Sequence, residues 1–153
     1  MLVRRVTSAD WRELRGVRLR ALESDAAAFS TSYSDAAERP DRWWRDWCER
    51  SSVGDQAIFM AWIEDRSVGM VGTFVGEEGR VLFGMWVDPG ERRHGVGRTL
   101  AEAVRALAHA AGDREVLLSV RNDNLQALAL YERVRYERVR NDGNDVIMSR
   151  RAG

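Results

Sequence analysis

The stretch VDPGERRHGVGRTL, residues 87–100, decides the fold that the sequence predicts. It joins the apolar end of a strand to a turn, two adjacent arginines and two glycines, and an amphipathic helical pattern follows directly. Glycines at such a junction let backbone N–H groups point outward beside the positive end of a helix dipole. The pattern therefore indicates either an anion site, with phosphate as the usual ligand, or a plain tight turn whose glycines only permit a positive φ.

Strand patterns precede this junction, and a helix and a further strand follow it. Residues 56–65, 67–76 and 80–89 are rich in β-branched and aromatic residues, and EDRS and GEEG between them are short enough for hairpin turns. These segments predict an antiparallel meander. After the junction, a helical stripe stops at Gly112 and residues 115–120 form an apolar run. A strand, a helix and a strand without a hairpin turn predict a parallel crossover.

The remaining segments complete one mixed α/β (α+β) fold. Residues 2–6 predict a first strand, two helices follow up to residue 50, a helix covers 124–134, and a hairpin closes across NDGN. The expected architecture is a mostly antiparallel central sheet of about seven strands with four helices. A length of 153 residues fits a single domain, residues 1–153.

Composition excludes several classes of protein. All 24 basic residues are arginine and 24 acidic residues balance them, so no overall basic field exists to hold nucleic acid. No apolar run is long enough to span a bilayer, and residues 1–11 lack a leader pattern, so we expect a cytoplasmic protein without a membrane partner. The single cysteine, Cys48, excludes an internal disulfide, and the isolated His94 and His109 do not make a metal site.

Two common nucleotide motifs do not fit the junction. A P-loop requires Gly-Lys-Ser/Thr, but Arg98 and Thr99 follow Gly97 and the chain has no lysine. A dinucleotide fingerprint that begins at Gly95 has Leu100 where its third glycine is required. The junction therefore matches neither the P-loop nor the dinucleotide-binding motif.

A third motif matches. Residues 92–97, RRHGVG, have the form Arg/Gln-x-x-Gly-x-Gly/Ala, and this segment resembles the signature of the GCN5-related N-acetyltransferase (GNAT) superfamily at its strand-to-helix junction. SVRNDNLQALALYERVRYERV, residues 119–139, is similar to the family's downstream segment, where an asparagine ends a strand and a tyrosine lies one helix later. Here these residues are Asn124 and Tyr131. The resemblance extends over nearly the whole order of elements.

The resemblance implies acetyl-CoA as the acyl donor, with its pyrophosphate on the N–H groups of residues 93–98. It also implies that the fourth and fifth strands splay apart, so that main-chain groups of residues 85–87 are free to bind the pantetheine arm. The donor-binding residues are then Met85, Trp86, Val87, Arg92, Arg93, His94, Gly95, Val96, Gly97, Arg98, Thr99, Asn124 and Tyr131. Arg92, Arg93 and Arg98 are either phosphate ligands or solvated surface residues.

The reaction that the resemblance implies is acetyl transfer to a primary amine of a small molecule, by direct attack in a ternary complex. The Val87 N–H is the expected oxyanion donor and Tyr131 the expected general acid for the CoA thiolate. No carboxylate occurs in residues 81–87, so the base stays unassigned: it is ordered water or an acid that borders the cleft. The acids considered are Asp35, Glu38, Glu64, Glu77 and Glu78. A covalent acetyl-cysteine route would need an activated thiol, and no histidine lies near Cys48 in sequence.

Three questions stay open at this level. The acceptor is a small amine or, alternatively, a protein or peptide N-terminus, and a non-catalytic acyl-CoA-binding module is the rival class. The aromatic residues of the acceptor region either line its wall or pack on the sheet; they are Phe29, Tyr33, Trp43, Trp44 and Trp47. One departure from the family pattern is Val134-Arg135-Tyr136, where a glycine is usual, so the helix end needs another cap or a strained residue. A homodimer is common in the family, and no interface is indicated.

Overall fold

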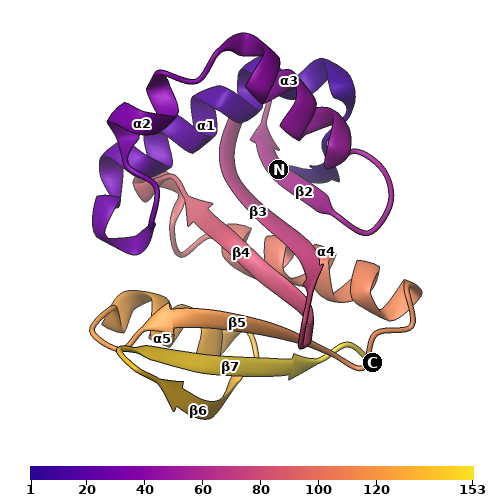
Figure 1. Cartoon of the computed structure of the whole chain (residues 1–153), viewed down its shortest axis with the longest axis vertical. Coiled ribbons are helices and arrows are strands. Elements are labelled where there is room, and N and C mark those ends of the chain that lie inside the picture. The colour runs from indigo at the N-terminus through magenta and orange to yellow at the C-terminus, as the bar shows by residue number, and fades with distance from the viewer.

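A single seven-stranded sheet runs through the computed structural model, which describes all residues 1–153 (Figure 1). The strands are β1 (Leu2–Arg5), β2 (Ala57–Ile63), β3 (Arg66–Gly76), β4 (Gly79–Val87), β5 (Glu115–Arg121), β6 (Glu137–Asp142) and β7 (Asp145–Arg151). They lie in the order β1-β2-β3-β4-β5-β7-β6, and every neighbouring pair is antiparallel except β4 and β5. The mixed, mostly antiparallel sheet and its parallel crossover are thus confirmed.

The chain has five α-helices, one more than the four predicted. They are α1 (Trp11–Ser24), α2 (Tyr33–Ala37), α3 (Asp41–Arg50), α4 (Val96–Ala110) and α5 (Leu125–Arg133). The additional helix is α2, where the Ser32 side chain accepts a hydrogen bond from the Asp35 N–H at 3.1 Å and caps the first turn. Five residues are too few to show a helical hydrophobic period, and this segment is also polar, so the sequence did not predict the helix.

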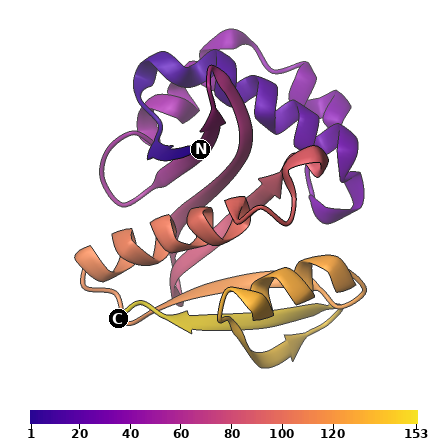
Figure 2. The same cartoon turned by 180° about the vertical axis from the view of Figure 1, so that it is seen from behind.

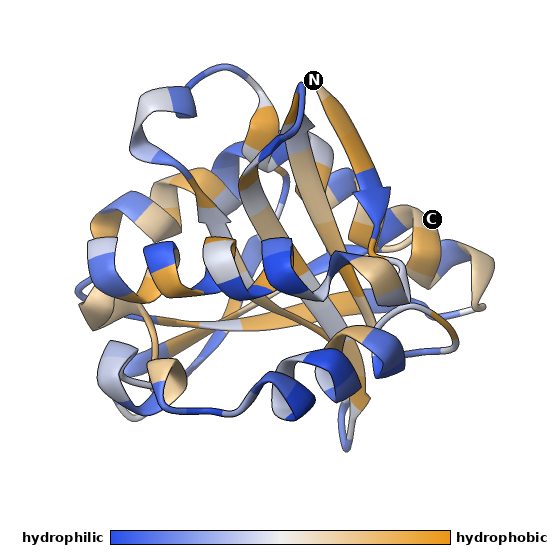
Figure 3. Ribbon diagram, turned by 90° about the horizontal axis from the view of Figure 1, so that it is seen from above, coloured by the Kyte–Doolittle hydropathy of each residue, from blue (hydrophilic) through white to orange (hydrophobic).

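Helices cover both faces of the sheet. The first three helices lie on one face, and Figure 2 shows α4 and α5 on the other. Trp44 and Leu14 are fully buried in the core under the first three helices, while Leu100 and Met148 are fully buried in the core under α4 and α5. Figure 3 shows hydrophobic residues along the central strands between these layers. None of the helices is both long and apolar enough to cross a lipid bilayer.

The sheet opens between β4 and β5. These strands pair only at Arg80 with Val116 and at Val81 with Leu117, and beyond that point they diverge (Figure 1). The buried Arg80 side chain holds the closed end, since its Nε bonds to the Asp113 carboxylate and its Nη1 donates to the Asp55 carbonyl at 2.9 Å. The expected splay between the fourth and fifth strands is therefore confirmed, and it leaves one edge of β4 without a partner strand.

Candidate active site

The loop before α4 supplies a set of unused backbone donors. Gly95 is the N-cap of α4 and has a left-handed φ of 85°, and Arg93 has a φ of 70°. The helical ladder begins with the Thr99 N–H, which donates to the Gly95 carbonyl at 3.1 Å. No backbone N–H from residue 93 through residue 98 donates a hydrogen bond within the protein. Six free donors beside the positive end of a 15-residue helix are the arrangement that an anionic group requires.

Gly97 is required by close packing, whereas Gly95 is required by its backbone conformation. A Cβ at Gly97 would lie 3.2 Å from Leu130 Cδ1 and 3.8 Å from Val87 Cγ2. The absence of a side chain therefore lets the first turn of α4 lie close to α5 and to the end of β4. A Cβ at Gly95 would meet nothing within 4 Å, so its left-handed backbone is the reason for glycine there.

The end of β4 faces the gap in the sheet. The Asp88 N–H donates to the Val68 carbonyl of β3 at 2.8 Å, and Trp86 is in register with Met70 of β3. Because successive residues of a strand direct their main-chain groups to opposite edges, Trp86 faces β3 and Val87 faces the gap. The Val87 carbonyl accepts from Arg92 Nε at 2.8 Å. Of the two, the Val87 N–H is therefore the main-chain donor available on the open edge.

Asp25 is a site residue that the sequence analysis missed. It follows α1, and its Oδ2 accepts hydrogen bonds from Trp86 Nε1 at 2.6 Å and from Arg92 Nη2 at 2.8 Å, whereas its Oδ1 accepts none. Burial alone would raise the pKa of Asp25, but hydrogen bonds from Trp86, Ser24 and Arg92 outweigh burial and lower the pKa. Asp25 is thus an ionised carboxylate with one free oxygen. Ser24 is adjacent in sequence, but nothing in the local sequence indicates the partners Trp86 and Arg92, which lie more than 60 residues away.

A cavity of about 140 Å³ lies where these elements meet. Eight of the predicted donor-binding residues line it: Met85, Trp86, Val87, Arg92, Arg93, Val96, Gly97 and Asn124. Asn124 also caps α5, because its Oδ1 accepts from the Ala127 N–H at 3.1 Å. Gly95, Thr99, Tyr131 and the exposed His94 do not line this cavity, and Arg98 lines another.

The acids at the cavity differ from those considered on the sequence. Asp25 and Glu91 line it, and none of the five candidates from the sequence does. Glu78, for example, pairs with Arg140 at 2.9 Å on the exposed surface. Glu91 is directed to other charges, since Arg66 lies 3.6 Å from its carboxylate. Asp25 is therefore the acid at the cavity that has a free oxygen and a fixed position.

Tyr131 and Tyr136 form an aromatic pair at the end of α5, with ring centroids 5.8 Å apart. The Tyr136 hydroxyl is fully enclosed and has no hydrogen-bond partner. The Tyr131 hydroxyl also forms no hydrogen bond within the protein, but it is not among the fully enclosed polar atoms. Burial raises the pKa of Tyr131 above its ordinary value of 10.0, so its phenol stays protonated at neutral pH. Tyr131 is the member of this pair that can donate a proton outward.

Two further residues answer questions raised by the sequence. Arg135 has a φ of 76°, so the helix end carries a strained residue where glycine is usual, at a cost of about 1 kcal/mol. Cys48 is buried, its Sγ donates to the Thr7 carbonyl at 3.1 Å, and burial raises the pKa of its thiol to about 11. A thiol in this state is not a nucleophile at neutral pH.

The aromatic residues of the acceptor region divide between cavity and core. Phe29 lines the cavity, and the Arg18 guanidinium lies 4.8 Å from its ring centroid. Trp44 is fully buried, and Trp43 and Trp47 pack beside it with ring centroids 4.8 and 5.9 Å from that of Trp44. The tryptophans of α3 therefore belong to the core under the first three helices, and Phe29 is the one of the five aromatic residues considered that lines the cavity.

The splayed sheet and the donor-rich loop at α4 define the class of protein as a GNAT-type acetyltransferase. The chain belongs to the Acetyltransferase (GNAT) family, whose model matches residues 18–135. Over 88 residues it is 38% identical to a mycothiol acetyltransferase of Geodermatophilus obscurus, a match that takes 53% of this chain and 29% of that protein. The chain thus spans less than a third of the length of this curated relative.

Solved structures share the whole fold at low sequence identity. A GNAT acetyltransferase from Streptococcus pneumoniae superposes with a TM-score of 0.82 at 20% identity and 99% coverage of both chains. The PaiA N-acetyltransferase of Thermoplasma acidophilum, solved in complex with coenzyme A, gives a TM-score of 0.81 at 21% identity and 98% coverage of both chains. At these identities the likeness establishes the fold.

Proposed function

We propose that this protein transfers the acetyl group of acetyl-CoA to a primary amine of a small molecule, by direct attack in a ternary complex. The observation that carries the proposal is the row of six unused N–H groups, residues 93–98, beside the unpaired edge of β4. A pyrophosphate suits such a row of donors, and an extended amide-containing arm suits a free strand edge. Acetyl-CoA supplies both groups and brings the acetyl thioester.

The residues around the gap then have distinct roles. The Val87 N–H stabilises the oxyanion that develops on the thioester carbonyl, because it is the main-chain donor of β4 that faces the gap. Tyr131 donates its proton to the departing thiolate, which its raised pKa permits because the phenol is fully protonated before the reaction. Arg92 holds the end of β4 in place through the Val87 carbonyl and so positions the oxyanion donor.

Asp25 binds the acceptor. Asp25 lines the cavity together with Trp86 and Val87, and its Oδ1 accepts no hydrogen bond, so in this proposal that oxygen attracts an ammonium group and orients the amine after deprotonation. Its lowered pKa makes it a weak base, so the proton of the ammonium leaves through water. The inert state of Cys48 favours direct attack over a covalent acetyl-enzyme.

The test is CoA release from acetyl-CoA in the presence of single amines. The panel contains small primary amines and a peptide with a free N-terminus, and product masses are measured in parallel with CoA binding by titration calorimetry. We expect release with small amines and intersecting initial-rate patterns. Acetylation of the peptide alone would instead assign an N-terminal acetyltransferase, and CoA binding without release on any amine would assign a non-catalytic module.

The acceptor role of Asp25 has its own matched pair of variants. Asp25→Asn keeps a hydrogen-bond acceptor for Trp86 and Arg92 but removes the negative charge, so the KM for the amine should rise at least tenfold while CoA affinity is unchanged. Glu91→Gln removes a charge from the same cavity at a carboxylate that faces Arg66, and its KM for the amine should stay near that of the parent protein. Equal KM values for the two variants would refute the role of Asp25.

A further inference from the structure

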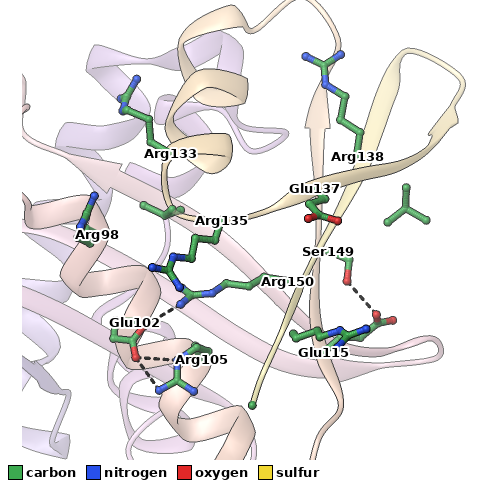
Figure 4. A pocket seen from close by; sticks show the side chains of 14 residues that line it. Arg98, Glu102, Arg105, Glu115, Arg133, Arg135, Glu137, Arg138, Ser149 and Arg150 are labelled. Carbon is green, nitrogen blue, oxygen red and sulfur yellow. Dashed lines mark hydrogen bonds and ion pairs between the residues drawn. The ribbon is translucent and has the colours of Figure 1, made fainter.

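A second cavity, of about 930 Å³, lies between α4, the end of α5 and the β6–β7 hairpin (Figure 4). Arginine dominates its lining. The charged residues are Arg98, Arg105, Arg133, Arg135, Arg138, Arg150 and Arg151 against Glu102, Glu115 and Glu137. Seven cationic and three anionic side chains line this concave surface of a protein whose net charge is zero, and one of the cations, Arg138, pairs with Glu132 outside the lining at 3.0 Å. We call this surface the arginine cavity.

The three glutamates do not neutralise the positive charge of the arginine cavity. Glu102 is shared, with Arg105 at 2.6 Å and Arg150 at 3.1 Å. Glu115 accepts from the Ser149 hydroxyl at 2.9 Å and pairs with no arginine. Four arginines of the cavity have neither a carboxylate within 4.0 Å nor a side-chain hydrogen bond: Arg98, Arg133, Arg135 and Arg151. Like charges gathered without counter-charges repel one another, and an anionic ligand would relieve that repulsion.

Arg135 lines the arginine cavity in a left-handed backbone conformation that is unfavourable for arginine. Its φ of 76° is a conformation that glycine adopts without strain. Figure 4 shows the guanidinium groups of Arg135 and Arg150 extending toward α4, into the space between the helix and the hairpin. A glycine at this position would end α5 at lower cost, but it would remove one of the unpaired cations. The strain is therefore located at the residue whose side chain contributes charge to the cavity.

We propose that the arginine cavity binds a small molecule that carries two or more phosphate groups, at a site separate from the donor cradle at residues 93–98. The volume lies within the range of small-molecule pockets, and guanidinium groups bind phosphate oxygens in a bidentate manner. Arg133 lines both cavities, and Arg98 contributes its N–H to the row of donors and its side chain to the arginine cavity, so the two sites adjoin at these two residues. This inference stands independently of the acetyl-transfer proposal.

The test titrates inorganic tripolyphosphate and, separately, ATP into protein saturated with CoA, by calorimetry. We expect one equivalent to bind, with an affinity that falls at least tenfold in Arg135→Gly and in Arg150→Gln. The melting temperature of Arg135→Gly should equal or exceed that of the parent protein, because the variant relieves the strained φ. Arg140→Gln is the matched control: it removes one positive charge from the same hairpin, at a residue paired with Glu78 outside the cavity, and should bind normally.

The two probes distinguish the sources of the phosphate groups. Tighter binding of ATP than of tripolyphosphate would support a nucleotide ligand, and equal affinity would support recognition of the phosphate chain alone. No binding to the CoA-saturated protein would overturn the proposal, since the cavity would then belong to the donor site. Unchanged affinity in both Arg135→Gly and Arg150→Gln would also overturn it.

Discussion

Replacing Tyr131 by phenylalanine removes one hydroxyl group from the end of α5 and nothing else. That hydroxyl forms no hydrogen bond within the protein, so its loss should leave the free energy of unfolding within about 1 kcal/mol of the parent value. If Tyr131 donates the proton to the CoA thiolate, kcat should fall at least tenfold, which corresponds to about 1.4 kcal/mol of transition-state free energy. We expect the lower part of the range for general acids, about 10²-fold, because burial raises the pKa of the phenol and weakens it as an acid.

Tyr136→Phe is the matched control for this experiment. Its ring lies beside that of Tyr131, and its hydroxyl is equally unbonded but fully enclosed. Removing this hydroxyl should leave kcat unchanged and should be neutral or slightly favourable for stability. The comparison therefore separates proton donation from packing at the same aromatic pair.

The assay measures kcat from CoA release, with the best amine of the panel, and the CoA dissociation constant by calorimetry. Tyr131→Phe should bind CoA within about twofold of the parent protein while kcat falls. Because the raised pKa keeps the phenol protonated, Tyr131 should cause no loss of kcat between pH 7 and about pH 10. An unchanged kcat in Tyr131→Phe, or an equal loss in Tyr136→Phe, would refute the role of Tyr131.

Three further predictions concern the donor loop, the closed end of the sheet and acid stability. Gly97→Glu should abolish the heat of CoA binding in calorimetry by placing a charge against the row of N–H donors, whereas Gly97→Ala should retain binding because only the Leu130 side chain, 3.2 Å away, must move. Arg80→Ala should lower the free energy of unfolding, measured in urea, by about 3 kcal/mol, because it leaves the Asp113 carboxylate without its buried partner. Near-normal stability would contradict the role of Arg80 at the closed end of the β4–β5 pair. The side-chain hydrogen bond from Arg4 lowers the pKa of Asp10, so this pair stabilises the fold above about pH 4 and its contribution is lost as pH falls. Asp10→Asn should therefore cost up to about 1 kcal/mol at pH 7 and less at pH 2, and an equal cost at both pH values would exclude this electrostatic origin.

Local patterns account for most of the predicted elements. The strands β2, β3 and β4 follow from runs of β-branched and aromatic residues between short turns, and α4 follows from its apolar stripe and the glycine after it. Because Arg135 stands where glycine is usual, the sequence predicted either another cap or a strained residue at the end of α5, and the structure has the strained residue. The short helix α2 was missed because five residues carry no period.

The candidate site was predictable only where it consists of consecutive residues. The donor loop lies in one segment, so its glycines and its position before α4 indicate free N–H groups directly. The proposed acceptor side is assembled from the residue after α1 and the end of β4, and no local signal connects Asp25 with Trp86. None of the acids considered on the sequence lines the cavity, because they were chosen by their neighbourhood along the chain, whereas the cavity is lined by residues that approach only after the sheet forms.

The sequence by itself determined the order of the elements, the family and the loop that faces the donor, because each depends on periodicity or on contiguous residues. The tertiary structure decided which carboxylate lines the cavity, which tyrosine hydroxyl is not fully enclosed, and where the arginines gather. Side chains from α4, β7 and the end of α5 share the arginine cavity although they are far apart in the chain. Their charges act on one another through space, and distance in space is set by how the sheet and helices pack rather than by the spacing of residues.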